Sequence, residues 1–158
     1  MPNSWRWWRR RLRAVARMPW SEKALAAEAI VMLAAARILI RFGSERDLVS
    51  RIGGTRVAAV APHEGGFPAA EPDEPRGIQI GAMLERAARH TWWRSMCLEM
   101  ALAGRWMLRR RGVPSTMYVG MAKRGGNFIA HAWLVGEGRT VTGASQESYA
   151  TLAAFRER

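Results

Sequence analysis

SMCLEMALAGRWMLRRRGVP, residues 95–114, is the stretch of sequence that decides the fold. Its apolar residues recur at the three- and four-residue spacing of one helix face, from about residue 96 to residue 111. Ser95 is expected to cap the start, and three arginines followed by Gly112 mark the end. The stretch therefore predicts a helix with Cys97 in its first turn.

Strand patterns follow this helix. Apolar and β-branched residues dominate three stretches, residues 116–121, 128–135 and 139–142, and turns rich in glycine separate these stretches. Three consecutive antiparallel strands are predicted. A last short helix is expected over residues 146–155.

Helices are also predicted upstream. Ser21 is expected to cap a long helix that Gly43 ends, and a shorter helix follows over residues 45–52. Proline, glycine and acidic residues then mark residues 61–77 as an exposed loop before a third helix at 78–90. Helices followed by a small sheet predict an α+β fold.

The whole chain has 158 residues, of which 49% are apolar. This predicts one domain over residues 21–158, preceded by a basic segment, residues 1–20. The net charge of +12 favours an anionic partner, although a bias of the genome toward arginine explains it equally well. Residues 5–17 have the pattern of a helix that makes peripheral contact with membranes; a basic tail, or tryptophans packed on the domain, are the alternatives.

A single cysteine excludes an intrachain disulfide, which favours a reducing cytoplasm. The apolar stretch 24–40 contains Glu28 and Arg37 and is shorter than the roughly 20 apolar residues of a membrane span, so we expect a core helix. One cysteine with three scattered histidines has no metal-ligand spacing. We expect no metal and no cofactor.

Cys97 and His131 are the candidate catalytic pair. A helix start favours the thiolate that attacks a carbonyl, and Arg94 adds a cation nearby in sequence. His131 interrupts an otherwise apolar strand, FIAHAWLV. A cysteine that only fills the core is the simpler alternative, but the order of helix, strands and histidine is what a cysteine–histidine acyl-transfer enzyme needs.

The blocks MCLEMAL (96–102), LRRRGV (108–113) and AHAWL (130–134) resemble the transglutaminase-like peptidases that remove leader peptides in lasso-peptide biosynthesis. The resemblance implies a papain-like core in which Cys97 attacks the bond between leader and core peptide and His131 is the acid and base. It also implies three partners: the precursor peptide, a separate leader-recognition protein of winged-helix type, and an ATP-dependent cyclase. Nucleic acid is not expected.

The third member of a triad is missing from its usual place. The family has an aspartate about a dozen residues beyond the histidine, where this chain has VTGA, residues 141–144. Glu137 is the acidic residue that we expect in its stead; Glu147, a backbone carbonyl or a water are the alternatives. We therefore expect a Cys97–His131 dyad.

Three tryptophans lie beside the predicted pair in sequence. Trp92, Trp93 and Trp133 are candidates to line a groove for an extended peptide, because large rings give contact area at small entropic cost. Packing in the core is the alternative for each of them, and we expect at least one to be buried.

Two other functions stay open. A transglutaminase-like acyltransferase, or a degraded and non-catalytic homologue, would have the same fold. A basic module that binds nucleic acid or a membrane surface would explain the charge, but no recognised binding motif supports it.

Overall fold

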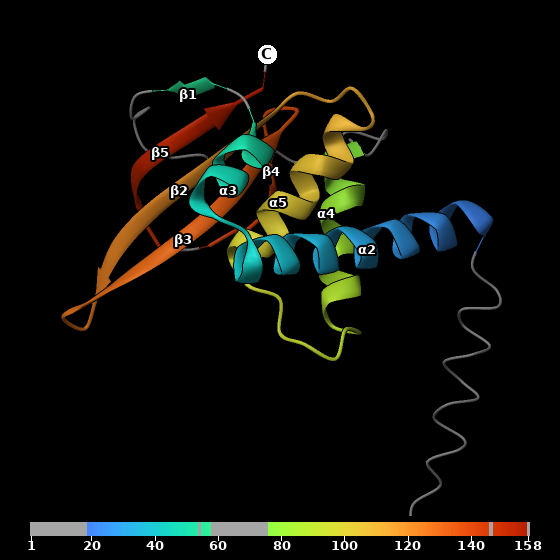
Figure 1. Cartoon of the computed structure of the whole chain (residues 1–158), viewed down its shortest axis with the longest axis horizontal. Helices are drawn as coiled ribbons and strands as arrows, with labels where there is room; N and C mark the ends of the chain where they lie inside the picture. Colours follow the sequence, from blue (N-terminus) through green and yellow to red (C-terminus); the bar gives the residue numbers. More distant parts are fainter. Residues whose placement is uncertain (1–18, 54, 58–75, 146, 158) are drawn as a thin grey trace, which may run out of the picture.

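The computed structural model describes residues 19–53, 55–57, 76–145 and 147–157. The basic segment, apart from its last two residues, and residues 61–75 of the expected loop lie outside the described residues. The predicted α+β fold is confirmed, with the helices gathered beside an antiparallel sheet (Figure 1). The elements are α2 (Trp20–Phe42), α3 (Glu45–Ile52), β1 (Thr55–Val57), α4 (Arg76–Ala88), α5 (Cys97–Arg109), β2 (Ser115–Arg124), β3 (Asn127–Gly136), β4 (Arg139–Thr142) and β5 (Ala150–Arg156).

Helix α5 is the centre of the packing, since it contacts α2, α4 and three strands. Small residues allow this close approach: a Cβ on Gly104 would lie 2.9 Å from Cδ2 of Leu134 on β3. The fully buried residues around α5 form one apolar core, which includes Ala29, Leu33, Ala36, Leu84, Ala101, Leu102, Met107, Leu108, Met117 and Leu134. No helix within the described residues is long and apolar enough to cross a bilayer.

Helix starts differ in detail from the prediction. Ser21 and Ser95 do not cap, because Pro19 and Met96 occupy the N-cap positions of α2 and α5. Helix α3 has the expected bounds, and Ser44 forms its cap: the hydroxyl accepts a hydrogen bond from the Asp47 N–H at 3.2 Å, and the Asp47 carboxylate accepts one from the Ser44 N–H at 3.0 Å.

The sheet has the strand order β1-β5-β2-β3-β4, and every neighbouring pair is antiparallel. The three predicted strands are confirmed as β2, β3 and β4. The predicted last helix is wrong, because residues 150–156 form β5 between β1 and β2. The alanines of ATLAAFR favour a helix locally, but the unpaired edge of β2 supplies backbone partners that outweigh this preference.

An ion pair links α2 to the turn that follows α5. Arg111 donates hydrogen bonds of 3.1 and 2.6 Å to the two carboxylate oxygens of Glu28. These bonds lower the pKa of Glu28 below its ordinary value of 4.5, against a smaller opposing effect of burial. The folded carboxyl is therefore harder to protonate than the unfolded one. The stabilisation is complete above the ordinary pKa and is lost as the pH falls through the folded pKa.

We predict that Glu28→Gln lowers the free energy of unfolding at pH 7 by about 1–2 kcal/mol. The difference from wild type should shrink as the pH falls through the lowered pKa of the folded Glu28, because the wild-type carboxyl then becomes protonated too. Urea unfolding at several pH values measures this, with the exposed Glu85→Gln as control. A difference that stays constant over this pH range would contradict the assignment.

Candidate active site

Cys97 is the first residue of α5. Its thiol is free and half-buried, and it packs against the apolar core. The first N–H groups of a helix have no partner within the helix and carry partial positive charge. Cys97 thus lies where a thiolate, and an oxyanion formed next to it, are stabilised electrostatically.

Glu99 fixes the start of this helix. Its carboxylate accepts a hydrogen bond from the Met96 N–H at 3.1 Å, and its other oxygen pairs with the Arg37 guanidinium of α2, also at 3.1 Å. Arg37 also donates to the Arg94 carbonyl at 3.3 Å. Because Glu99 is only 4% exposed, the arginine offsets a buried negative charge close to Cys97.

His131 lies in the middle of β3, and Gly143 holds its ring. Nε2 is 2.8 Å from the Gly143 carbonyl oxygen. A carbonyl only accepts, so Nε2 carries the hydrogen and donates it. In the neutral ring Nδ1 then has no hydrogen and keeps its lone pair. A general base needs such a free lone pair to accept a proton.

Aromatic rings surround the imidazole. Tyr149 stacks on it with ring centres 4.7 Å apart, and Trp133 lies at 6.1 Å in a nearly parallel orientation. Trp133 stacks in turn on Tyr118 at 5.3 Å, and the Tyr149 hydroxyl donates to the Glu147 carboxylate at 3.1 Å. The ring of His131 is therefore fixed by a hydrogen bond at one edge and by stacking.

The side chains of β3 alternate between the two faces of the sheet. Leu134 points to α5, where it meets Gly104, and Ala132 is buried on the same face. His131 and Trp133 point to the other face. Among the described residues, no hydrogen bond joins the Cys97 thiol to the imidazole. The catalytic pairing of the two residues therefore stays a prediction.

Glu137 is not brought to His131. It lies in the turn after β3 with a left-handed φ of 53°, and its carboxylate accepts a hydrogen bond of 2.9 Å from the Gly77 N–H of α4. It lies six positions beyond His131 along a largely extended chain, about 20 Å at roughly 3.3 Å per residue. In the described residues, the carbonyl of Gly143, twelve positions beyond His131, holds the ring instead.

Gly143 also explains why no side chain stands at this position. Its φ is +77°, and a Cβ would lie 2.6 Å from the Ala132 carbonyl oxygen and 2.9 Å from Cβ of Trp133. An aspartate here would be strained and would collide with β3. The spacing of twelve residues from His131 was the sequence signal for this partner.

The three tryptophans have different surroundings. Trp92 is 94% exposed and meets the half-buried Trp93 edge to face at 5.4 Å. Trp93 packs against the core, and Trp133 belongs to the stack on His131. Their role in binding a peptide stays a prediction. Among the described residues, no group of three or more histidine, cysteine or acidic side chains is placed to hold a metal ion.

Comparison with known proteins gives a family match. The family model described as the transglutaminase-like superfamily matches residues 36–154. No curated protein matches the chain, and no solved structure does. The matched region contains Cys97, His131 and Gly143.

Alanine substitutions at two glycines test the close packing around Gly143. Gly138 has a similar φ of +72°, but a Cβ there would meet nothing within 4 Å. We predict that Gly138→Ala lowers the free energy of unfolding by about 1 kcal/mol, because alanine is strained in the left-handed conformation. Gly143→Ala should lower it by at least about 2 kcal/mol more, because the backbone must also move to make room for the Cβ. Chemical denaturation of both variants measures the difference. Equal losses would contradict the close packing of Gly143 on β3.

Proposed function

The chain belongs to the transglutaminase-like superfamily, in which catalysis by a cysteine is typical, and from this premise we propose that it is a cysteine peptidase. Its substrate is the ribosomal precursor of a lasso peptide, and the bond cleaved joins the leader to the core peptide. The observation that carries the proposal is the position of Cys97: the one cysteine of the chain is the first residue of the central helix of this domain.

The proposed reaction has two steps. The Cys97 sulfur attacks the carbonyl carbon of the scissile peptide bond while Nδ1 of His131 takes the thiol proton, and the proton then passes to the leaving nitrogen as the C–N bond breaks. Water next attacks the thioester with His131 as base, and this releases the acid and the thiol. The N–H groups at the start of α5 are the donors for the oxyanion.

Approach of the imidazole to the thiol is part of this proposal. General base catalysis needs the two groups within about 3 Å, and catalytic hydrogen bonds often tighten only when substrate binds. In the described structure the stack with Trp133 and Tyr149 and the hydrogen bond to the Gly143 carbonyl hold the ring on the face of β3 opposite to α5, so a turn of the ring toward Cys97, out of these contacts, is a step that the proposal adds. Because a carbonyl has no net charge, it stabilises the imidazolium less than an aspartate would.

The proposed partners follow from the same assignment. A separate leader-recognition protein of winged-helix type delivers the precursor, and an ATP-dependent cyclase takes the liberated core peptide and closes its ring.

The acyltransferase alternative differs only in the group that attacks the thioester, which is an amine in place of water. Adding an amine and measuring the mass of the product distinguishes the two reactions: an acyltransferase gives the amine adduct, and a peptidase gives the free acid.

We predict that Cys97→Ala abolishes cleavage of the precursor and that His131→Ala slows it by about 10²–10⁴-fold, because the first removes the nucleophile and the second the proton acceptor. The measurement is the mass of the products after incubation with precursor and recognition protein. Circular dichroism of each variant controls for folding. Cleavage by a folded Cys97→Ala protein would refute the mechanism.

The assignment of Glu137 gives a separate prediction. Because its carboxylate bonds to α4 and not to His131, Glu137→Gln should leave the cleavage rate within about twofold of wild type and lower the free energy of unfolding by about 1 kcal/mol. Parallel turnover and denaturation measurements test this. A hundredfold loss of rate in a protein of normal stability would make Glu137 the third catalytic residue after all.

A further inference from the structure

Helix α2 has a second apolar stripe that the core does not cover. Val31, Ala35, Ile38 and Phe42 follow one another at steps of four, three and four residues, which is the spacing of a seam between two packed helices. All four are exposed, Val31 and Ile38 at 60% and Phe42 at 79%. The buried residues Ala29, Leu33 and Ala36 have the same spacing on the opposite side of the helix.

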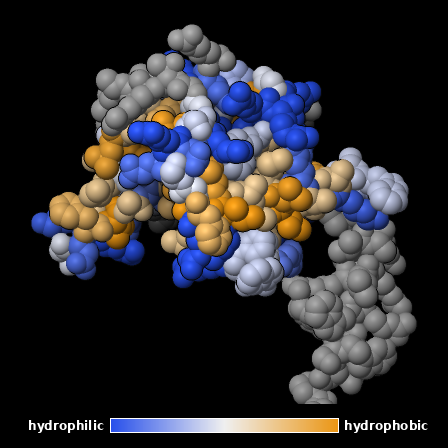
Figure 2. All heavy atoms as spheres, in the orientation of Figure 1, coloured by the Kyte–Doolittle hydropathy of each residue, from blue (hydrophilic) through white to orange (hydrophobic). Residues whose placement is uncertain are grey.

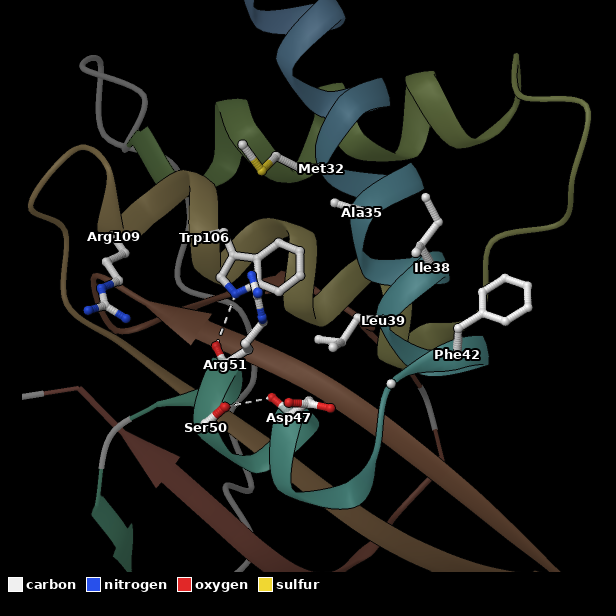
Figure 3. Close-up of a pocket in the computed structure, with 11 residues that line it drawn as sticks. Met32, Ala35, Ile38, Leu39, Phe42, Asp47, Ser50, Arg51, Trp106 and Arg109 are labelled. Atoms are coloured by element: carbon white, nitrogen blue, oxygen red, sulfur yellow. Dashed lines mark hydrogen bonds between the residues drawn. The ribbon is translucent and has the colours of Figure 1, made fainter.

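A groove runs beside this stripe. It has a volume of about 940 Å³ and lies between α2, α3 and α5. Figure 3 shows Ile38, Leu39 and Phe42 on one side and Trp106 of α5 across from them. Figure 2 shows hydrophobic side chains gathered on this face of the molecule. Soluble domains seldom leave such a continuous apolar surface uncovered without a partner.

One end of the groove is cationic. Arg51 and Arg109 line it, and the Trp106 indole N–H donates to the Arg51 carbonyl at 3.1 Å, which fixes α3 against α5 (Figure 3). Asp47 of the lining stays a carboxylate while it accepts two hydrogen bonds from Ser44, and Arg109 also lies 3.9 Å from the Glu157 carboxylate. The lining has two cations against one carboxylate, on a chain of net charge +12, so a ligand for this end should carry negative charge.

We propose that this groove binds an amphipathic α-helix of a partner protein, with the partner's apolar face on the α2 stripe and its carboxylates beside Arg51 and Arg109. The stripe runs from residue 31 to residue 42, which is eleven steps or about 16 Å at 1.5 Å per residue, so the partner contributes at least three helical turns. This is the helix-in-groove mode of recognition, in which side chains three and four positions apart provide the anchors. The binding is independent of the chemistry of Cys97.

Charge decides between this occupant and two others. A second copy of the chain would bring a molecule of net charge +12 against one of the same charge, with arginines at the facing grooves. The chain's own residues 1–17 contain six arginines and no acidic residue, so they are repelled by the same groove end. An acidic helix is attracted to it.

Labelled 18-residue peptides and the full-length protein test the proposal by fluorescence anisotropy. One peptide has leucines at heptad spacing and glutamates elsewhere, a second has lysine for each glutamate, and a third has the residues of the first in scrambled order. The expected result is that the first peptide binds at least tenfold more tightly than the other two. Equal binding of the first and third peptides would overturn the proposal.

Two groove variants and a matched control locate the binding site. Ile38→Glu should weaken binding of the acidic peptide at least tenfold, and Leu152→Glu on β5, which replaces an apolar residue of similar exposure, 52%, should leave it unchanged. The double variant Arg51→Glu/Arg109→Glu should reverse the preference toward the lysine peptide. Unchanged binding in Ile38→Glu, with circular dichroism showing a folded protein, would overturn the proposal.

Sedimentation velocity without peptide tests the second copy. A monomer for wild type and for Ile38→Glu is expected. A wild-type dimer that Ile38→Glu converts to monomer would assign the groove to self-association and overturn the acidic partner. These experiments measure peptide binding and oligomeric state, and none of them measures cleavage. A negative result would therefore overturn the docking proposal without bearing on the proposed peptidase activity.

Discussion

The guanidinium of Arg105 is fully buried in the middle of α5, and the arrangement of three segments depends on it. It donates to the Phe155 carbonyl of β5 at 2.7 Å and to the Gly53 carbonyl at the end of α3 at 2.9 Å. Burial lowers the pKa of Arg105, and the nearby Glu157 carboxylate acts in the opposite direction. A buried cation persists only with such partners, so the helix, the end of α3 and the last strand are held in one geometry.

The first residue of the same helix, Cys97, is the proposed nucleophile. Arg105 sets the position of α5 against the sheet, and Glu99 with Arg37 sets the residue at which it begins. Cys97 is thereby fixed in the first turn, whereas His131 belongs to the opposite face of β3 within an aromatic stack. The proposed nucleophile is thus fixed by the contacts of α5, and the proposed base is oriented separately by its hydrogen bond to Gly143.

The sequence predicted the elements whose signals are local. The bounds of α3, the end of α2 at Gly43 and the three strands β2 to β4 follow from caps, glycines and alternation. It failed where long-range partners decide: β5 is a strand because β2 offers backbone partners and the Arg105 guanidinium bonds to the Phe155 carbonyl. The predicted cap of α5 was also wrong, because Met96 and not Ser95 occupies the N-cap position and its N–H donates to Glu99. The partner of His131 stayed one of several alternatives, because the spacing of a dozen residues indicates the position but Gly143 supplies a backbone carbonyl there and no side chain, while Glu137 bonds to α4.

The central claim, that Cys97 forms a covalent acyl intermediate, is tested most directly by the mass of the intact protein. The reaction with precursor and recognition protein is quenched in acid within its first turnover, and the protein is weighed and mapped. The account predicts a mass increase equal to the acyl fragment, carried by the peptide that contains Cys97, the one cysteine of the chain. Cleaved product without any such adduct, or an adduct on a different residue, would contradict it.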